Sequence, residues 1–329
     1  MSSRIVAATP AAIARAAEHL RAGDLVAFAT ETVYGLGADA RNADAVHRIF
    51  AAKGRPSDHP VIVHVATIEQ ARRWTREFPD GARQLAAAFW PGPLTLILPR
   101  AAHVGDAITG GQDSVGLRMP SHPVANALLA AFAALGGDGI AAPSANRFGH
   151  VSPTTAAHVE EDLGDAVAMI VDGGACDVGI ESTIVAFTEG KPVLLRPGGI
   201  GIDALVRVLG SAPRSPDANA PRASGTLASH YAPHAPARLV RSVALLREIT
   251  QRATIGERVA VLARTVARPA GFGGAWTSAP TDVAGYAHDL YASLRALDQP
   301  GVTTILVESL PDDDAWLAVR DRLMRAARQ

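Results

Sequence analysis

Residues 51–65, AAKGRPSDHPVIVHV, decide how the first part of the chain is interpreted. The stretch ends an apolar-periodic segment, breaks at a glycine and a proline, and resumes as the β-branched run Val61–Val65, which predicts helix, loop and strand. Two cations, Lys53 and Arg55, stand at the break. The chain holds 31 Lys and Arg residues, yet its lysines are Lys53 and Lys191 alone, so the ammonium at position 53 is distinctive.

The pair of cations has two interpretations. A lysine ammonium is a point charge and an arginine guanidinium is a planar fork, so the two side by side suit a polyphosphate. Alternatively, they only complement the dipole at the C-terminus of the helix. This stretch alone leaves both interpretations open.

Length and composition restrict the class of protein. A chain of 329 residues fits two domains, and 48% apolar with 19% charged residues indicates a folded globular protein. The net charge of −1 argues against a positive electrostatic potential over the whole protein, which would attract nucleic acid. The single cysteine, Cys176, excludes a disulfide framework. Charged residues near the start leave no signal-peptide core and no apolar run is long enough to span a bilayer, so we expect a cytoplasmic protein.

Periodicity and turn residues predict α/β organisation along the whole chain. In the first part, helices are predicted at 10–22, 67–78, 82–90, 124–135, 154–163 and 202–209, and strands at 25–29, 61–65, 94–98, 114–120, 139–142, 168–171, 184–187 and 193–196. Residues 1–210 form the predicted first domain. Residues 211–236 are rich in proline, alanine and serine and predict a linker. Residues 237–329 alternate strand and helix, which predicts a smaller doubly wound α/β domain.

Several common sites are excluded. Residues 35–40, GLGADA, match a dinucleotide fingerprint weakly, but the glycines come too late after the strand and no suitable acidic residue follows. No P-loop or HExxH motif occurs. His230 and His234 have Pro233 between them and cannot share a helical face as zinc ligands do. Cys176 has no cation beside it, which predicts an inert thiol.

Hydroxyl, amide and cationic side chains follow the predicted strands. They are Thr30, Thr32, Lys53, Arg55, Ser114, Arg118, Ser144, Asn146, Ser152, Ser182 and Arg196. If these strands form one sheet, the loops can converge on a ligand rich in phosphate and carboxylate oxygens. Alternatively, each of these residues, considered alone, only closes a turn or extends into solvent at the end of a strand. Taken together, with few carboxylates to balance them, they favour an anionic ligand.

Seven blocks of the first domain carry a family resemblance. They are TETVYGLGADA, KGRPSDHPVIVHV, WPGPLTLIL, VGLRMPSHP, IAAPSANRFGHVSPTT, DGG…GIESTIV and LLRPGGIG. In this order they resemble the threonylcarbamoyl-AMP synthases, the YrdC/TsaC-like family. The segment SHYAPHAP and the following α/β region are similar to the two-domain long form. The resemblance implies a YrdC-like twisted mixed sheet flanked by helices, followed by a smaller Rossmann-like α/β domain.

The resemblance also implies a reaction and its partners. L-threonine, bicarbonate or CO2, and ATP would give threonylcarbamoyl-adenylate and pyrophosphate, so the protein would be a nucleotidyltransferase. Mg2+ would accompany ATP, with no metal held by protein ligands. Other proteins would then transfer the threonylcarbamoyl group to tRNA. No membrane and no strong direct nucleic-acid binding are expected.

Residue roles follow from the same resemblance. Threonine would contact Thr30, His64, Arg118, Ala142 and Ser182. ATP would contact Lys53, Arg55, Ser114, Ser144, Asn146, Ser152, Arg196 and, from the linker, Tyr231. Lys53, Arg55, Ser144 and Asn146 form the family's Lys-x-Arg and Ser-x-Asn signature and would be the catalytic set. The linker would close over the nucleotide as a lid.

Two departures and two alternatives accompany this interpretation. Ala29 stands where proline is common in the family, and the C-terminal domain is short, which leaves its role open. One alternative is a carbamoyl-adenylate-forming enzyme of hydrogenase maturation, against which the lone cysteine argues because a zinc-finger segment is then expected. The other is an RNA-binding or ribosome-assembly factor, which the net charge of −1 disfavours.

Overall fold

The computed structural model describes residues 4–328. It divides into two compact units. The first contains the chain up to Phe148 together with Pro153–Thr226, and the second contains Gly149–Ser152 and the chain from Leu227 onward. The predicted linker, residues 211–236, forms no helix or strand in the described chain, and its two parts fall to different units.

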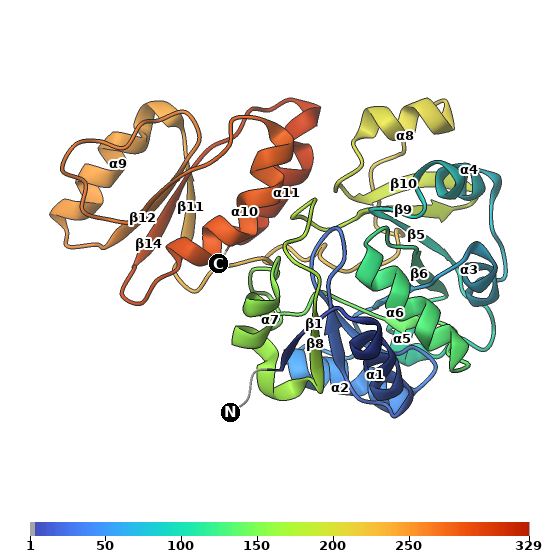
Figure 1. The fold of residues 1–329 in the computed structure, drawn as a ribbon. Helices are drawn as coiled ribbons and strands as arrows, with labels where there is room; N and C mark the ends of the chain where they lie inside the picture. Colours follow the sequence, from blue (N-terminus) through green and yellow to red (C-terminus); the bar gives the residue numbers. More distant parts are fainter. Residues whose placement is uncertain (1–3, 329) are drawn as a thin grey trace. The chain divides into compact units, whose positions relative to one another are not determined.

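A 10-stranded mixed sheet forms the centre of the first unit, in the order β1-β8-β2-β3-β7-β4-β6-β5-β9-β10 (Figure 1). Its strands are β1 (Ile5–Ala7), β2 (Val26–Phe28), β3 (Gly35–Asp39), β4 (Ile62–His64), β5 (Leu94–Pro99), β6 (Ser114–Arg118), β7 (Ile140–Ala141), β8 (Met169–Asp172), β9 (Thr183–Thr188) and β10 (Lys191–Arg196). β4 and β6 run parallel, whereas β5 runs antiparallel to β6. This mixed sheet confirms the predicted class of fold.

Helices cover both faces of this sheet. They are α1 (Pro10–Arg21), α2 (Ala43–Lys53), α3 (Ile68–Trp74), α4 (Asp80–Phe89), α5 (Asp106–Thr109), α6 (Pro123–Ala134), α7 (Ala156–Leu163), the short 3-10 turn η1 (Gly164–Ala166) and α8 (Ile202–Leu209). α1 and α6 lie side by side and bury Leu20 and Leu128 against Phe28 of β2 (Figure 1). The other helices pack with the larger core cluster, which includes Ile49 and Leu85.

Local sequence signals explain several helix boundaries. Thr67 begins α3 with a capping box, in which its hydroxyl accepts from the N–H of Gln70 and the Gln70 side chain reaches back. The helix ends at Trp74, earlier than the predicted residue 78, because Thr75 is extended. At the end of α2, Gly54 adopts the left-handed conformation with φ 63° and closes the helix directly after Lys53.

The segment at residues 35–40, for which no strand was predicted, contains β3. β3 pairs antiparallel with β2, so the glycines belong to the sheet. At Gly37 a Cβ atom would lie 2.9 Å from the Phe28 ring, closer than packed atoms allow. The glycines therefore make room for an aromatic side chain of the neighbouring strand.

The second unit is a small parallel α/β fold. Its strands are β11 (Ala237–Val240), β12 (Val259–Ala263), β13 (Trp276–Ser278) and β14 (Thr304–Glu308), in the order β11-β14-β12-β13. Its helices are α9 (Ser242–Thr254), α10 (Val283–Leu297), η2 (Asp314–Trp316) and α11 (Leu317–Ala326). α9 covers one face of this sheet, and α10 and α11 cover the other (Figure 1). This confirms the predicted Rossmann-like second fold.

Candidate active site

The pairing of three strands places polar side chains on one face of the first unit. His64 of β4 and Thr95 of β5 both stand opposite Arg118 of β6. Since side chains opposite each other in a sheet share a face, these three point to the same side. The Thr95 hydroxyl lies 2.8 Å from the Ser182 hydroxyl, which joins the loop before β9 to this face. All four residues are buried.

Arg118 has an anionic neighbour in the loop after β2. Its Nη2 atom lies 2.8 Å from Oε1 of Glu31, and both side chains are only 5% exposed. The adjacent Thr30 is fixed within the same loop, because its hydroxyl donates to the Val33 carbonyl oxygen at 2.7 Å. Glu31 was not among the residues that the sequence singled out.

The histidine and the cysteine near this face are uncharged. Burial and then the Arg118 charge lower the pKa of His64 to about 3. Burial raises the pKa of Cys176 to about 12. The buried cysteine is therefore a thiol and not a thiolate, in line with the prediction of an inert side chain.

Lys53 occupies a different part of the first unit. Its Nζ donates to the backbone carbonyl oxygen of Ser144 at 2.6 Å and to that of Asn146. The side chain is buried, and this burial, followed by the charge of Arg55, lowers the pKa of Lys53 well below its usual value. The predicted Lys-x-Arg and Ser-x-Asn segments are thus in direct contact.

Two arginines connect the Lys53 region with the Ser182 loop. Arg196, at the end of β10, donates from Nε to the Ser182 carbonyl oxygen at 3.1 Å and from Nη1 to the Ser224 carbonyl oxygen at 2.8 Å. Arg55 donates from Nη2 to the Pro60 carbonyl oxygen at 2.8 Å and reaches the Ser224 hydroxyl at 3.4 Å. The loops that carry Arg55, Arg196 and Ser182 are therefore in direct contact through Ser224, and their convergence on an anion stays a prediction.

Ser224 joins this network through packing that is remote in sequence. The neighbouring Ala223 is buried in one core cluster with Ile97, Ile184 and Leu195, which belong to β5, β9 and β10. The Ser224 hydroxyl also donates to the Pro60 carbonyl oxygen at 2.9 Å. Residues 220–226 thus pack on the first unit, although the composition of this segment predicts only a linker.

The remaining predicted residues divide between the two units. Ala142 follows β7 and donates from its backbone N–H to the Ile62 carbonyl oxygen at 3.0 Å. Ser114, at the start of β6, lines a small cavity that Ser224 also lines. Ser152 and Tyr231 belong to the second unit and are buried there. The ring of Tyr231 stacks on Tyr291, with centroids 5.7 Å apart.

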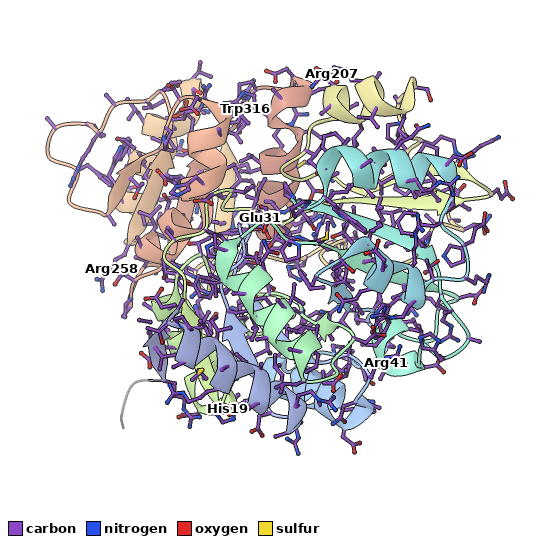
Figure 2. The ribbon with its side chains drawn as sticks, turned by 45° about the vertical axis from the view of Figure 1, so that its right-hand side comes forward. His19, Glu31, Arg41, Arg207, Arg258 and Trp316 are labelled. Atoms are coloured by element: carbon purple, nitrogen blue, oxygen red, sulfur yellow. The ribbon has the colours of Figure 1, made fainter. Side chains whose placement is uncertain are left out.

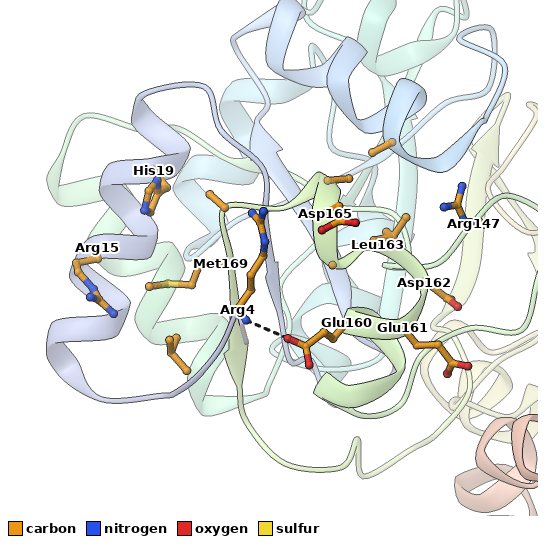
Figure 3. A pocket seen from close by; sticks show the side chains of 15 residues that line it. Arg4, Arg15, His19, Arg147, Glu160, Glu161, Asp162, Leu163, Asp165 and Met169 are labelled. Atoms are coloured by element: carbon orange, nitrogen blue, oxygen red, sulfur yellow. Dashed lines mark hydrogen bonds between the residues drawn. The ribbon is translucent and has the colours of Figure 1, made fainter. Parts of the chain in front are cut away.

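No metal centre of protein ligands is present in residues 4–328, since no group of three His, Cys, Asp or Glu side chains there could hold an ion. A separate polar pocket of the first unit is shown in Figure 3. Glu160 of α7 accepts there from the backbone N–H of Arg4 at 2.9 Å. None of the predicted site residues lines this pocket, so it is not the candidate site.

The geometry so far defines an α/β protein whose first unit buries lysine, arginine and hydroxyl side chains in neighbouring loops. Comparison with known families agrees. Residues 18–198 match the Sua5/YciO/YrdC family model, described as "Telomere recombination", and residues 200–328 match the model "Threonylcarbamoyl-AMP synthase, C-terminal domain". The chain belongs to the Sua5/YciO/YrdC family, in its form with the additional C-terminal domain.

Similar proteins cover nearly the whole chain. A threonylcarbamoyl-AMP synthase of Pyrococcus abyssi is 41% identical over 95% of this chain and 93% of its own length. One of Bacillus subtilis is 43% identical over 96% and 92%. The structure of P. abyssi Sua5, described as complexed with L-threonine, matches with a TM-score of 0.90 and 39% identity over 98% of this chain and 97% of that one. These relatives favour the first interpretation over hydrogenase maturation and RNA binding.

The helices give one finding about membranes. Within residues 4–328, none combines the length and the apolar character that crossing a bilayer requires. The predicted cytoplasmic location stays a prediction.

Proposed function

We propose that this chain is an L-threonylcarbamoyladenylate synthase, an enzyme that joins L-threonine, bicarbonate or CO2, and ATP and releases pyrophosphate. The observation that carries the proposal is the set of buried cations in the first unit, in a chain whose full-length relatives bear this name. Buried cations are costly unless an anion or hydrogen-bond acceptors compensate them. A substrate with three phosphates and another with a carboxylate supply such anions.

The threonine carboxylate binds Arg118. A guanidinium offers two parallel donors that match a carboxylate, and two donor atoms of Arg118, Nε and Nη2, have no hydrogen-bond partner among residues 4–328. His64 lies beside Arg118 as a neutral imidazole and adds no second charge. Thr30, Ala142 and Ser182 complete this end of the site.

The triphosphate of ATP binds Lys53, Arg55 and Arg196. The hydroxyl and amide groups of Ser114, Ser144 and Asn146 supply neutral donors, and the family resemblance adds Ser152 and Tyr231 as further contacts of ATP. Mg2+ enters with ATP. Phosphate oxygens and water would hold the ion, since they are the ligands that Mg2+ prefers.

The chemistry requires positioning more than covalent help from the protein. The threonine ammonium first loses a proton to give the neutral amine, which forms an N–C bond with CO2 and releases a second proton to water to become a carbamate. A carbamate oxygen then attacks the α-phosphorus, and the bond to the β-phosphate oxygen breaks as pyrophosphate leaves. The cations neutralise the charge on the phosphates during this displacement, and the buried site excludes water from the mixed anhydride. The product passes to proteins that transfer the threonylcarbamoyl group to tRNA.

Substrate-dependent pyrophosphate release tests the proposal. The purified full-length chain is incubated with ATP, Mg2+, bicarbonate and L-threonine, and each component is omitted in turn. We expect release only with the complete mixture. Release that is unchanged without threonine would exclude the synthase, and release that requires carbamoyl phosphate would support the hydrogenase-maturation alternative instead.

A further inference from the structure

Glu31 is a buried carboxylate beside Arg118, and the proposed reaction gives it no role. It lies in the loop after β2 and is labelled in Figure 2. Its side chain is 5% exposed, and the ion-pair partner found for it in the described residues is Arg118, at 2.8 Å. A buried carboxylate beside the arginine that binds the substrate carboxylate weakens that arginine's attraction for anions. Its presence therefore calls for an explanation.

The loop holds Glu31 in place. The Glu31 carbonyl oxygen accepts from the backbone N–H of Val178 at 2.7 Å, which ties the loop to the glycine-rich segment before β9. The hydroxyls of Thr30 and Thr32, on either side of Glu31, lie 2.9 Å apart. These contacts fix the backbone on both sides of the carboxylate, so its position does not depend on a ligand.

The contact between Glu31 and Arg118 leaves hydrogen-bonding capacity unused. Within residues 4–328, neither oxygen of Glu31 forms a well-aligned hydrogen bond, and neither do Nε and Nη2 of Arg118, although the backbone N–H groups of Glu31 and Ser121 help to hold the carboxylate in its charged form. The two groups form an ion pair, but their atoms are not aligned as in a hydrogen bond. Buried polar atoms are nearly always paired, so a ligand with both donors and acceptors is expected between or beside them.

Glu31 and Arg118 form a buried ion pair at this end of the site. Burial acts against the charged form of Glu31, but the Arg118 guanidinium outweighs it and lowers the pKa of the carboxyl below its usual value. His64 and Cys176 are neutral, as described above. A buried pair of one cation and one anion matches a zwitterion better than a simple anion.

We propose that Glu31 binds the α-ammonium group of the amino acid whose carboxylate binds Arg118. The two charged groups of an α-amino acid are joined through one carbon atom, so they can reach two side chains that already touch each other. Ligand binding then replaces one poorly aligned ion pair with two charge-assisted hydrogen-bonded pairs. This inference rests on the proposed function, because it takes the amino-acid substrate from it.

Glu31 thereby selects α-amino acids over α-hydroxy acids. A hydroxy acid offers Arg118 the same carboxylate but leaves the Glu31 charge without its partner, which carries a large cost in a buried site. The alternative is that Glu31 only holds the Arg118 side chain in position. In that case its loss weakens every carboxylate ligand to the same extent.

Binding of two ligands to two proteins separates these roles. Isothermal titration calorimetry on the full chain gives Kd values for L-threonine and for 2,3-dihydroxybutanoate, which has a hydroxyl in place of the amino group. We expect Glu31→Gln to weaken threonine about tenfold or more and to leave the hydroxy acid within about threefold. Equal weakening of both ligands, or no weakening of threonine, would overturn the proposal.

Controls keep the result interpretable. Glu31→Asp retains the charge and should preserve the preference for threonine with reduced affinity. Glu189→Gln, in the exposed turn after β9, should change neither ligand. If Glu31→Gln fails to fold by circular dichroism, the Asp variant decides: loss of the preference despite the retained carboxylate contradicts the proposal.

The same samples distinguish failure of this inference from failure of the proposed function. Wild-type protein that binds threonine but releases no pyrophosphate contradicts the synthase and leaves the role of Glu31 supported by the Kd ratio. Wild-type protein that is active, combined with a Glu31→Gln variant whose Kd ratio is unchanged, contradicts only the role of Glu31.

Discussion

Arg196 Nη1 donates to the backbone carbonyl oxygen of Ser224 at 2.8 Å, across 28 residues of sequence. Arg55 reaches the hydroxyl of the same serine at 3.4 Å. Two of the three cations proposed to bind the triphosphate are therefore in contact with the segment that follows the first unit's last helix. A phosphate oxygen would take the place of an uncharged carbonyl or hydroxyl oxygen at these guanidinium groups.

Ser224→Asp should therefore compete with ATP. The new carboxylate is placed where Arg196 and Arg55 can bind it, so it resembles a bound phosphate. We expect KM for ATP to rise about tenfold, equal to about 1.4 kcal/mol, with kcat at saturating ATP nearly unchanged. KM for threonine should stay constant.

Ser215→Asp is the matched control, since it adds the same charge to an exposed part of the same segment. Pyrophosphate-release kinetics give KM for ATP, KM for threonine and kcat. A Ser224→Asp variant with the wild-type KM for ATP would mean that Arg196 and Arg55 do not bind the triphosphate.

Lys53→Arg should be nearly as damaging as Lys53→Met. Lys53 is buried and its ammonium contacts two backbone carbonyl oxygens, so a longer planar group does not fit the same space. We expect a loss of apparent ATP affinity of about tenfold or more in both variants, as expected for a charge-assisted hydrogen bond of about 1.5–3 kcal/mol. Lys191→Arg, at the other, exposed lysine, should have wild-type kinetics. Full activity of Lys53→Arg would show that any cation suffices.

Much of the fold could be predicted because its signals are local. α8 begins and ends where periodicity and turn residues place it, at Ile202 and Leu209. β3 could not be predicted from its glycine-rich sequence, because the reason for Gly37 is the Phe28 ring on the adjacent strand. The pairing of distant segments decides such positions, and a local pattern does not contain it.

The candidate site also contains residues that a local sequence signal identifies and residues that only distant packing places. Lys53, Arg55 and Arg118 could be singled out because each stands at a break next to a predicted strand. Ser224 could not, since its place depends on burial of Ala223 against strands far away in the sequence. Glu31 was visible in the TET motif, but a carboxylate contradicts a simple anion site, and only its contact with Arg118 gives it a role.

Arg118→Lys should lose nearly as much threonine affinity as Arg118→Ala. A lysine keeps the charge but cannot donate two parallel hydrogen bonds to a carboxylate. We expect KM for threonine to rise about tenfold or more in each variant. Arg207→Lys on the exposed side of α8 provides the control. An unchanged dependence on threonine in Arg118→Lys would mean that Arg118 supports the strand without gripping the substrate.

Glu308→Gln should lower the stability of the second unit. Glu308 ends β14 and accepts from the backbone N–H groups of Arg264 and Thr265 at 2.6 and 2.8 Å and from the Ser242 hydroxyl at 2.7 Å. Burial opposes its charge, but these hydrogen bonds and that of the Thr265 hydroxyl lower its pKa from 4.5 to about 2. The stabilisation is therefore complete at pH values above the pKa that the Glu308 carboxyl has in the unfolded chain. It is lost as the pH falls through the pKa that this carboxyl has in the folded chain. It corresponds to about 2–3 kcal/mol.

Urea unfolding of the full chain at several pH values measures this contribution. At pH 7, Glu308→Gln should unfold at lower urea concentration, and its stability should vary less than that of the wild type between about pH 5 and about pH 2. Asp312→Asn changes an exposed carboxylate of the same unit and should leave the profile unaltered. Parallel profiles for wild type and Glu308→Gln would contradict the assignment.

Tyr231→Phe tests whether the tyrosine hydroxyl contacts the nucleotide. Tyr231 is buried, its ring stacks on Tyr291, and the Arg322 guanidinium lies 5.2 Å from its centroid. Phenylalanine preserves these ring contacts and removes only the hydroxyl, so the thermal stability should stay close to that of the wild type. If the hydroxyl donates to a phosphate, KM for ATP should rise about tenfold, as expected for a hydrogen bond to a charged group. Tyr291→Phe removes a hydroxyl from the stacked partner and should leave KM unchanged. Unchanged ATP kinetics in Tyr231→Phe, together with a lower melting temperature in Tyr231→Ala, would assign Tyr231 to the packing of the second unit alone.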